Sequence, residues 1–221
     1  NLTGVVELHI KGNKGQKVKL RHGETLDAEG KFYMANLRQA KAEDTFILNG
    51  EEQTLLPHFT FHGFRYVAVE GLSNEQMAHW QECFCACVMH SDMEKIGDFW
   101  CSDEKVNRLQ ENIAWSLRDN FLDIPTDCPQ RDERLGWMGD AQVFSWTAAF
   151  NRNTARFFTK WMRDLAAESS LEKGVPHVVP DIVGSYSSSA WSDAAVIIPW
   201  VVYQSYGDER ILEECWKCMH E

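Results

Sequence analysis

The periodicity of the apolar residues changes once along this chain, near residue 98, and this change constrains the fold more than any other feature. Before it, apolar and polar residues alternate, as at Val6, Leu8 and Ile10, and Gly-containing turns separate short runs. After it, apolar residues recur every three or four positions. The pattern predicts a β domain over residues 1–97 and an α-helical domain over residues 98–221.

Further segments of the first half have the spacing of strands. Phe59 and Phe61 form an alternating pair, and residues 64–69 alternate over a longer run. Residues 83–89 form an apolar run that we expect to be buried on both faces. Several short strands at close spacing are typical of an antiparallel β-sandwich.

The second half predicts an array of helices joined by loops. The expected helices follow a Ser102 cap, cover residues 141–150 and 157–165, and lie on either side of Gly207. In the helix over 141–150, four residues are expected to face inward, namely Val143, Phe144, Thr147 and Phe150. A loop rich in Ser, Gly and Pro spans residues 169–190. Because no strand pattern lies between the helices, we expect an αα array and not a Rossmann sheet.

The charge balance and the apolar runs exclude several classes of partner. The chain has 33 acidic and 22 basic residues, a formal net charge of -11, so nucleic-acid binding is disfavoured. No apolar run reaches the roughly 18–20 residues that a membrane span needs, so no membrane association is expected. The first residues lack the pattern of a signal peptide. The chain begins without Met inside a strand-like pattern, which indicates a piece of a longer protein, and a homo-oligomer is compatible with the sequence.

The seven cysteines favour reduced thiols, because their number is odd and the chain is large enough to fold without disulfides. Reduced thiols predict a cytoplasmic location. Cys83, Cys85 and Cys87 alternate and are expected to be small buried residues. His58 and His62 are four residues apart in a strand-like segment, where they lie too far apart to share an ion. We therefore expect no metal site.

The most unusual segment is the acidic loop from Asp123 to Asp140, which includes Glu133 and several Asp residues. Glycoside cleavage needs a carboxylic acid to protonate the leaving oxygen, a second carboxylate, and aromatic faces that stack on the sugar. Eight of the nine Trp residues lie in the second half of the chain. The same loop residues are equally suited to cap helices and to pair with Arg131 and Arg134 on a solvated surface, and residue chemistry alone favours neither interpretation.

Residues 127–142, Asp-Cys-Pro-Gln-Arg-Asp-Glu-Arg-Leu-Gly-Trp-Met-Gly-Asp-Ala-Gln, closely resemble the signature of bacterial α-L-rhamnosidases of glycoside hydrolase family 78. The similarity extends to shorter segments on both sides. They are Leu20–Glu24, Asn36–Arg38, Phe61–Val67, Gly174–Pro176, Pro180–Asp181, Ala190–Ala194, Pro199–Trp200, Tyr203 and Tyr206–Asp208. The resemblance therefore covers nearly the whole chain.

The resemblance implies a concanavalin-like antiparallel β-sandwich domain followed by the first helices of an (α/α)6 barrel. It also implies hydrolysis of terminal α-L-rhamnose from rhamnosyl glycosides by an inverting mechanism, with no cofactor. Two alternatives remain at this stage. One is an (α/α)6 glycosidase of different sugar specificity, and the other is a non-catalytic carbohydrate-binding fragment.

The resemblance also implies roles for individual residues. The family's general acid lies seven residues before the Asp that ends the Trp-x-Gly-Asp motif, which gives Glu133 from Asp140, with Asp132 as the nearest alternative. The residues expected to contact the sugar are Asp127, Arg131, Asp132, Trp137 and Asp140, with Trp191 and Asp193 as weaker candidates. Asp193 is equally expected to cap its helix. The family's general base belongs to a later part of the barrel, and because we find no counterpart here we expect this chain alone to be inactive.

Overall fold

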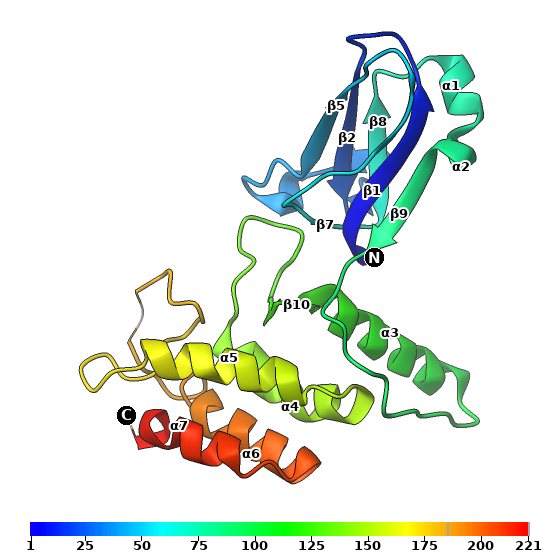
Figure 1. Ribbon diagram of the computed structural model, residues 1–221. Helices are drawn as coiled ribbons and strands as arrows, with labels where there is room; N and C mark the ends of the chain where they lie inside the picture. Colours follow the sequence, from blue (N-terminus) through cyan, green and yellow to red (C-terminus); the bar gives the residue numbers. More distant parts are fainter. Residues whose placement is uncertain (185, 221) are drawn as a thin grey trace. The chain divides into compact units, whose positions relative to one another are not determined.

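The computed structural model describes residues 1–184 and 186–220 (Figure 1). The chain forms two compact units. The first, called here the β unit, comprises Asn1–His90 and Cys128–Arg134. The second, called the helical unit, comprises Ser91–Asp127 and Leu135–Glu221. The predicted domain boundary between residues 97 and 98 stays a prediction.

The β unit contains two main antiparallel sheets (Figure 1). In the first sheet, β1 (Leu2–Lys11) pairs along one edge with β6 (Glu52–Leu55) and β7 (His62–Phe64), and along the other with β9 (Phe84–Val88). In the second sheet, β2 (Lys17–Gly23) lies between β5 (Glu43–Ile47) and β8 (Tyr66–Glu70). The smaller elements are the hairpin β3 (Thr25–Leu26) and β4 (Phe32–Tyr33), the 3-10 helix η1 (Ala35–Leu37), and the short helices α1 (Asn74–Ala78) and α2 (Trp80–Cys83).

The two sheets share one apolar core, which makes the unit a sandwich. Val6, Leu8 and Ile10 of β1 are buried in the same cluster as Val18 and Leu20 of β2. Because strand side chains alternate between faces, these positions place one face of each sheet on the core. The predicted alternation and the predicted antiparallel sandwich are confirmed.

The alternating run predicted over residues 64–69 is divided between the two sheets. Phe64 ends β7 and belongs to the core, and Val67 and Val69 of β8 pack against that same core. Uninterrupted alternation would place Phe64 and Val67 on opposite faces. The chain changes sheets at Arg65, so the side-chain alternation starts again, and residues on both sides of the break face inward.

Two other strand predictions are wrong. Phe59 is fully exposed and has a left-handed backbone with φ of 58°, so the segment around it is a loop. The apolar run over residues 83–89 is not buried on both faces, because β9 exposes Cys85 and Val88. This strand pairs only with β1, so it lies at the edge of the sheet, where burial is less complete.

The helical unit contains five main helices, as predicted (Figure 1). They are α3 (Glu104–Asn120), α4 (Met138–Asn151), α5 (Ala155–Glu168), α6 (Ala194–Tyr206) and α7 (Arg210–His220). Helix α6 packs against α4, α5 and α7. A small hairpin of β10 (Phe121–Leu122) and β11 (Ile124–Pro125), which the periodicity did not indicate, follows α3.

The start of α3 and the end of α6 are as predicted, except that the N-cap of α3 lies one residue later than expected. Asp103, not Ser102, is the N-cap of α3, and its carboxylate accepts a hydrogen bond from the backbone N–H of Lys105 at 2.8 Å. Gly207 ends α6 with a left-handed φ of 69°, as expected of a helix-terminating glycine. The predicted loop over residues 169–190 is irregular throughout its described residues, and Ser185 lies outside them.

The apolar stripe of α5 is predicted correctly, whereas the inward face of α4 is predicted only in part, since Phe144 packs against the core. In α5, residues from Phe157 to Leu165 supply the buried positions. In α4, Val143 is 79% exposed and Phe150 52% exposed, while Ala141 and Ala148 are buried. Helix α4 has apolar residues on both faces, so periodicity does not decide which face packs. Its small residues face the core because they allow close approach.

None of the described helices is long and apolar enough to cross a membrane. None of the seven cysteines, all of which lie in the described residues, forms a disulfide.

Candidate active site

The signature segment, residues 127–142, runs from the end of β11 into α4, and a pair of hydrogen bonds closes its base. The backbone N–H of Asp127 donates to the carbonyl of Leu135 at 2.9 Å. The backbone N–H of Leu135 donates to Asp127 Oδ1 at 2.8 Å. Both residues belong to the helical unit. The Asp127 side chain therefore fixes the point at which the loop starts and ends.

The residues inside this closure, Cys128–Arg134, belong to the β unit and are called here the docked loop. The Arg134 guanidinium donates to the Phe61 carbonyl at 2.7 Å and lies 4.3 Å from the centre of the Phe61 ring. Gly63 faces Gln130 so closely that a Cβ at Gly63 would lie 3.0 Å from the Gln130 backbone nitrogen. An arginine anchor and a glycine contact thus fix the loop.

Glu133 lies between two arginines of the β unit. Its Oε2 accepts from Nη2 of Arg131 at 2.7 Å and from Nη1 of Arg38 at 3.1 Å. The Glu133 side chain is 16% exposed, whereas that of Arg38 is 53% exposed. The carboxylate is therefore partly withdrawn from water, and two guanidinium groups fix its orientation and favour its charged form.

Asp132, the nearest alternative to Glu133, has a different environment. It is exposed, and its Oδ2 accepts a hydrogen bond from the backbone N–H of Gln39 at 3.3 Å. Asp132 therefore contacts a backbone amide, while Glu133 contacts two cations. Two adjacent carboxylates of the docked loop have different electrostatic surroundings.

In the helical unit, Asp127 and Asp140 line one small pocket of about 170 Å³. Its other walls are Ser116, Asn120, Phe121, Pro125, Thr126, Ala141 and Phe144. Two carboxylates and several polar side chains thus lie around a partly apolar surface. Sites for drug-sized ligands measure about 300–1,000 Å³, so this pocket is smaller than such a site.

Both parts of the chain match families of known function. Residues 1–90 match the bacterial alpha-L-rhamnosidase concanavalin-like domain, and residues 94–221 match the bacterial alpha-L-rhamnosidase 6 hairpin glycosidase domain. The chain belongs to the bacterial α-L-rhamnosidase family. The predicted sandwich and first helices of a six-hairpin barrel are thereby confirmed.

Individual relatives are similar to this chain over nearly its whole length. An alpha-L-rhamnosidase of Formosa agariphila is 43% identical over 99% of the chain, which spans 24% of that protein. The solved Streptomyces avermitilis alpha-L-rhamnosidase complexed with L-rhamnose matches with a TM-score of 0.93 and 41% identity, over 100% of this chain and 21% of its own. The native Aspergillus terreus enzyme matches with a TM-score of 0.94 and 45% identity, over 100% and 26%. The chain spans about a quarter of the length of these relatives.

In this chain, Trp137 and Trp191 lie near the start of α4. Trp137 is the residue before the helix, and it forms an isolated antiparallel bridge with Val178. The Trp191 indole lies against Gly139, where an added Cβ would be 3.2 Å from the indole nitrogen. Trp191 is 39% exposed, and its ring centre lies 5.6 Å from that of His177. Gly139 therefore allows an exposed aromatic face to lie beside Asp140.

Asp193 does not cap α6 through its side chain, although it occupies the N-cap position. Its Oδ2 accepts a hydrogen bond from the backbone N–H of Ala190 at 3.1 Å. Ala190 has a left-handed φ of 72°. Asp193 thus stabilises the turn that presents Trp191, and the expected helix-capping role is not observed.

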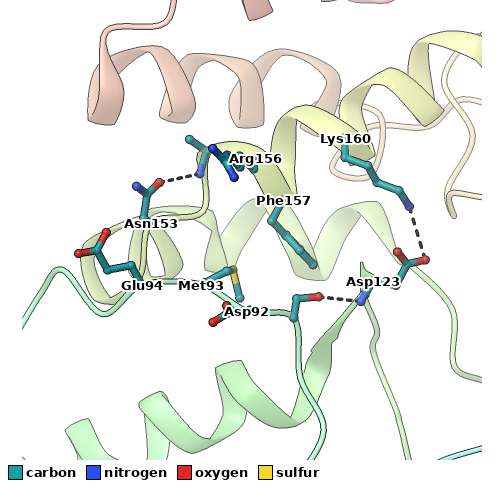
Figure 2. Close-up of a pocket in the computed structure, with 10 residues that line it drawn as sticks. Asp92, Met93, Glu94, Asp123, Asn153, Arg156, Phe157 and Lys160 are labelled. Carbon is teal, nitrogen blue, oxygen red and sulfur yellow. Dashed lines mark hydrogen bonds and ion pairs between the residues drawn. The ribbon is translucent and has the colours of Figure 1, made fainter.

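A larger pocket of about 590 Å³ in the helical unit contains none of the residues predicted for the site (Figure 2). Lys160 lies 3.5 Å from Asp123 and 3.0 Å from Asp164. The Asp123 backbone N–H is bonded to the Ser91 hydroxyl at 2.8 Å. These contacts explain Lys160 and Asp123 as members of a local ion-pair and hydrogen-bond network, and the size of the pocket alone does not make it the sugar site.

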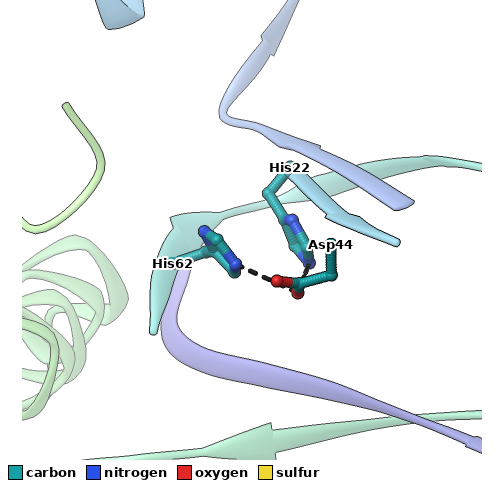
Figure 3. A group of neighbouring side chains, drawn as sticks. All are labelled: His22, Asp44 and His62. Carbon is teal, nitrogen blue, oxygen red and sulfur yellow. Dashed lines mark hydrogen bonds and ion pairs between the residues drawn. The ribbon is translucent and has the colours of Figure 1, made fainter. Parts of the chain in front are cut away.

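The β unit also contains a buried cluster of His22, Asp44 and His62 (Figure 3). The two imidazole rings stack with centres 4.0 Å apart and planes 11° apart. Nε2 of His62 lies 3.0 Å from Asp44 Oδ2, and Nδ1 of His22 lies 3.1 Å from the Ala42 carbonyl. Imidazole lone pairs lie in the ring plane, so the lone pairs of two nearly parallel stacked rings do not converge on one ion. His58, which is four residues before His62 in the sequence, is exposed and lies outside the cluster, in agreement with the expectation that these two residues share no ion.

Sequence reasoning gave no role to Arg38, Gln39 or His177, although each contacts a predicted site residue. Asn36–Arg38 is part of the family resemblance, so a signal for Arg38 was present. It did not connect Arg38 with Glu133, because 95 positions separate these residues in the chain.

We expect Arg134→Met to destabilise the β unit by about 1–3 kcal/mol, because it removes a partly buried guanidinium and leaves the Phe61 carbonyl without this donor. Burial lowers the pKa of Arg134, which agrees with its withdrawal from water. Urea unfolding followed by fluorescence measures the change. Arg65→Met is the matched control, because Arg65 is exposed and is expected to change stability by less than about 0.5 kcal/mol. Equal effects of the two variants would contradict the proposed anchor.

A second prediction concerns pH. Burial, and next the neighbouring His62, lower the pKa of His22 from 6.5 to about 4. The unfolded chain therefore binds more protons than the folded one between these values, so stability falls as pH drops from 6.5 to 4 and this contribution levels off below 4. The loss reaches about 3 kcal/mol at 1.36 kcal/mol per pH unit.

Urea unfolding at pH 7, 5.5 and 4.5 measures this loss. The His22→Gln protein, which lacks the titrating ring, should have a shallower pH dependence over the same range. Identical slopes in both proteins would show that other groups cause the acid sensitivity.

Proposed function

We propose that the protein containing this chain hydrolyses terminal α-L-rhamnose from rhamnosyl glycosides by an inverting mechanism. The observation that supports this most directly is Glu133, a partly buried carboxylate between two arginines within a rhamnosidase signature. The Streptomyces avermitilis relative, solved with L-rhamnose, adds support for the sugar.

Glu133 is proposed as the general acid, because its orientation is fixed more strongly than that of Asp132. Asp127 and Asp140, which share one pocket, are proposed to accept hydrogen bonds from rhamnose hydroxyls. Arg131 is proposed to donate to the sugar. The weaker proposals for sugar contact are Trp137 and Trp191 as stacking faces, with Asp132 and Asp193 at the edge of the site.

In the proposed reaction, Glu133 transfers its proton to the glycosidic oxygen as the bond to the anomeric carbon breaks. A water molecule attacks that carbon from the opposite face and gives its proton to a carboxylate base. In an inverting pair, the acid and base carboxyl groups lie about 6.5–9.5 Å apart. We assign no base among the residues of this chain.

Glu133 must be protonated when it acts, whereas Arg38 and Arg131 favour its charged form. We propose that a bound rhamnose hydroxyl takes the Arg131 donor, which weakens the stabilisation of the carboxylate. The developing negative charge on the leaving oxygen then favours proton transfer.

Two broader predictions stay proposals. One is a domain boundary between residues 97 and 98. The other is a cytoplasmic location, which the seven cysteines without disulfides support.

The test is rhamnose release from an aryl α-L-rhamnoside by the full-length protein. Glu133→Gln should reduce kcat by about 10²–10⁴-fold, the usual contribution of a general acid. Asp132→Asn is the matched control and should reduce kcat by less than about tenfold. If Asp132→Asn causes the larger loss, the acid assignment moves to Asp132. If the wild-type protein releases no rhamnose, the proposed function is wrong.

A further inference from the structure

We propose that Arg38, a residue of the β-sandwich, is a positioning residue for Glu133, and this inference rests on the proposed function. Its Nη1 donates to Glu133 Oε2 at 3.1 Å across 95 positions of sequence. Arg131 contacts the same oxygen at 2.7 Å. Arg38 thus makes a second contact, in addition to that of Arg131, that orients the Glu133 carboxyl group.

The backbone at Arg38 indicates that its placement is specific. Arg38 has φ of 57° and ψ of -116° directly after η1, a conformation that side chains other than glycine rarely adopt. Leu37, fully buried, anchors the preceding turn. The next residue, Gln39, donates its backbone N–H to Asp132 at 3.3 Å. Strain of this kind persists where the surrounding structure fixes it, and it occurs frequently at functional sites.

Arg38 is not needed to hold the docked loop. Arg134 and the close contact between Gly63 and Gln130 fix the loop at other points. The Arg38 side chain is 53% exposed, so water screens its ion pair with Glu133 and limits what the pair contributes to stability. The backbone at Arg38 is thus strained, while the contact that its side chain makes contributes little to folding stability. A role of Arg38 in orienting the acid accounts for both the strain and the small contribution to stability.

This role has a specific chemical consequence. When the aglycone is a poor leaving group, the glycosidic oxygen needs the proton from Glu133, and a misoriented acid slows the reaction. When the aglycone is a nitrophenolate, the bond breaks with little protonation, and the orientation of the acid matters less. Loss of Arg38 should therefore affect the two substrate types unequally.

The experiment compares kcat/KM of the full-length wild type, Arg38→Gly and Arg38→Lys on a nitrophenyl α-L-rhamnoside and on a rhamnosyl disaccharide. Arg38→Gly should lower kcat/KM about 10–100-fold on the disaccharide and less than about threefold on the nitrophenyl substrate. The alkaline limb of its pH profile should move to higher pH, because a positive charge that favours the Glu133 carboxylate is removed. Its melting temperature should not fall, because glycine relieves the strained φ.

Arg38→Lys should restore the alkaline limb, since the charge is retained. It should leave the disaccharide rate below that of the wild type, since an ammonium does not reproduce the fixed direction of the guanidinium donor. Arg65→Ala, at an exposed arginine of the same unit, is the control and should behave as wild type.

An equal loss on both substrates with a lower melting temperature would show a purely structural role and overturn the inference, as would wild-type kinetics of Arg38→Gly. Neither result touches the proposed function, which fails separately if the wild type releases no rhamnose or if Glu133→Gln is fully active.

Discussion

The packing of the docked loop, Cys128–Arg134, on the β unit is the constraint on which the candidate site depends. Arg134 gives up part of its hydration to bond the Phe61 carbonyl and to lie over the Phe61 ring. Because Gly63 has no side chain, the Gln130 backbone can also approach it closely. With the loop fixed in this way, the acidic residues that follow Gln130 meet residues of the sandwich, although they are encoded within the helical half.

The sandwich is therefore more than a neighbouring module in this protein. It provides a guanidinium to Glu133 and a backbone amide to Asp132. Because of these two contacts, the carboxylates of Asp132 and Glu133 have different surroundings, although the two residues are adjacent and chemically similar in the sequence. A strained residue next to the proposed acid agrees with the general observation that such conformations persist at functional sites, where geometry matters more than local stability.

The helical unit contributes a different part of the proposed site. Asp127 closes the base of the loop and lines the small pocket with Asp140, and Gly139 permits Trp191 to lie beside the start of α4. The apolar side chains on the outer face of α4, such as Val143 and Phe150, are exposed in this chain, which spans about a quarter of the length of its relatives.

The sequence by itself determined the local structure and the chemistry of the signature. Alternation placed Val6, Leu8 and Ile10 inward, helical spacing predicted the buried stripe of α5, and Gly207 marked the end of a helix. These features depend on neighbours within a few residues, where periodicity and backbone preference decide the outcome. The motif also indicated Glu133, although its role as acid stays a proposal.

Only the tertiary structure decided which distant residues meet. In the folded chain, the run over residues 64–69 is divided between two sheets. The small-residue face of α4 is the face that is buried. The tertiary structure also brought Arg38 to Glu133 and stacked His22 on His62. Such pairings depend on the packing of whole elements and on charges that meet only after folding, and no local pattern of residues contains that information.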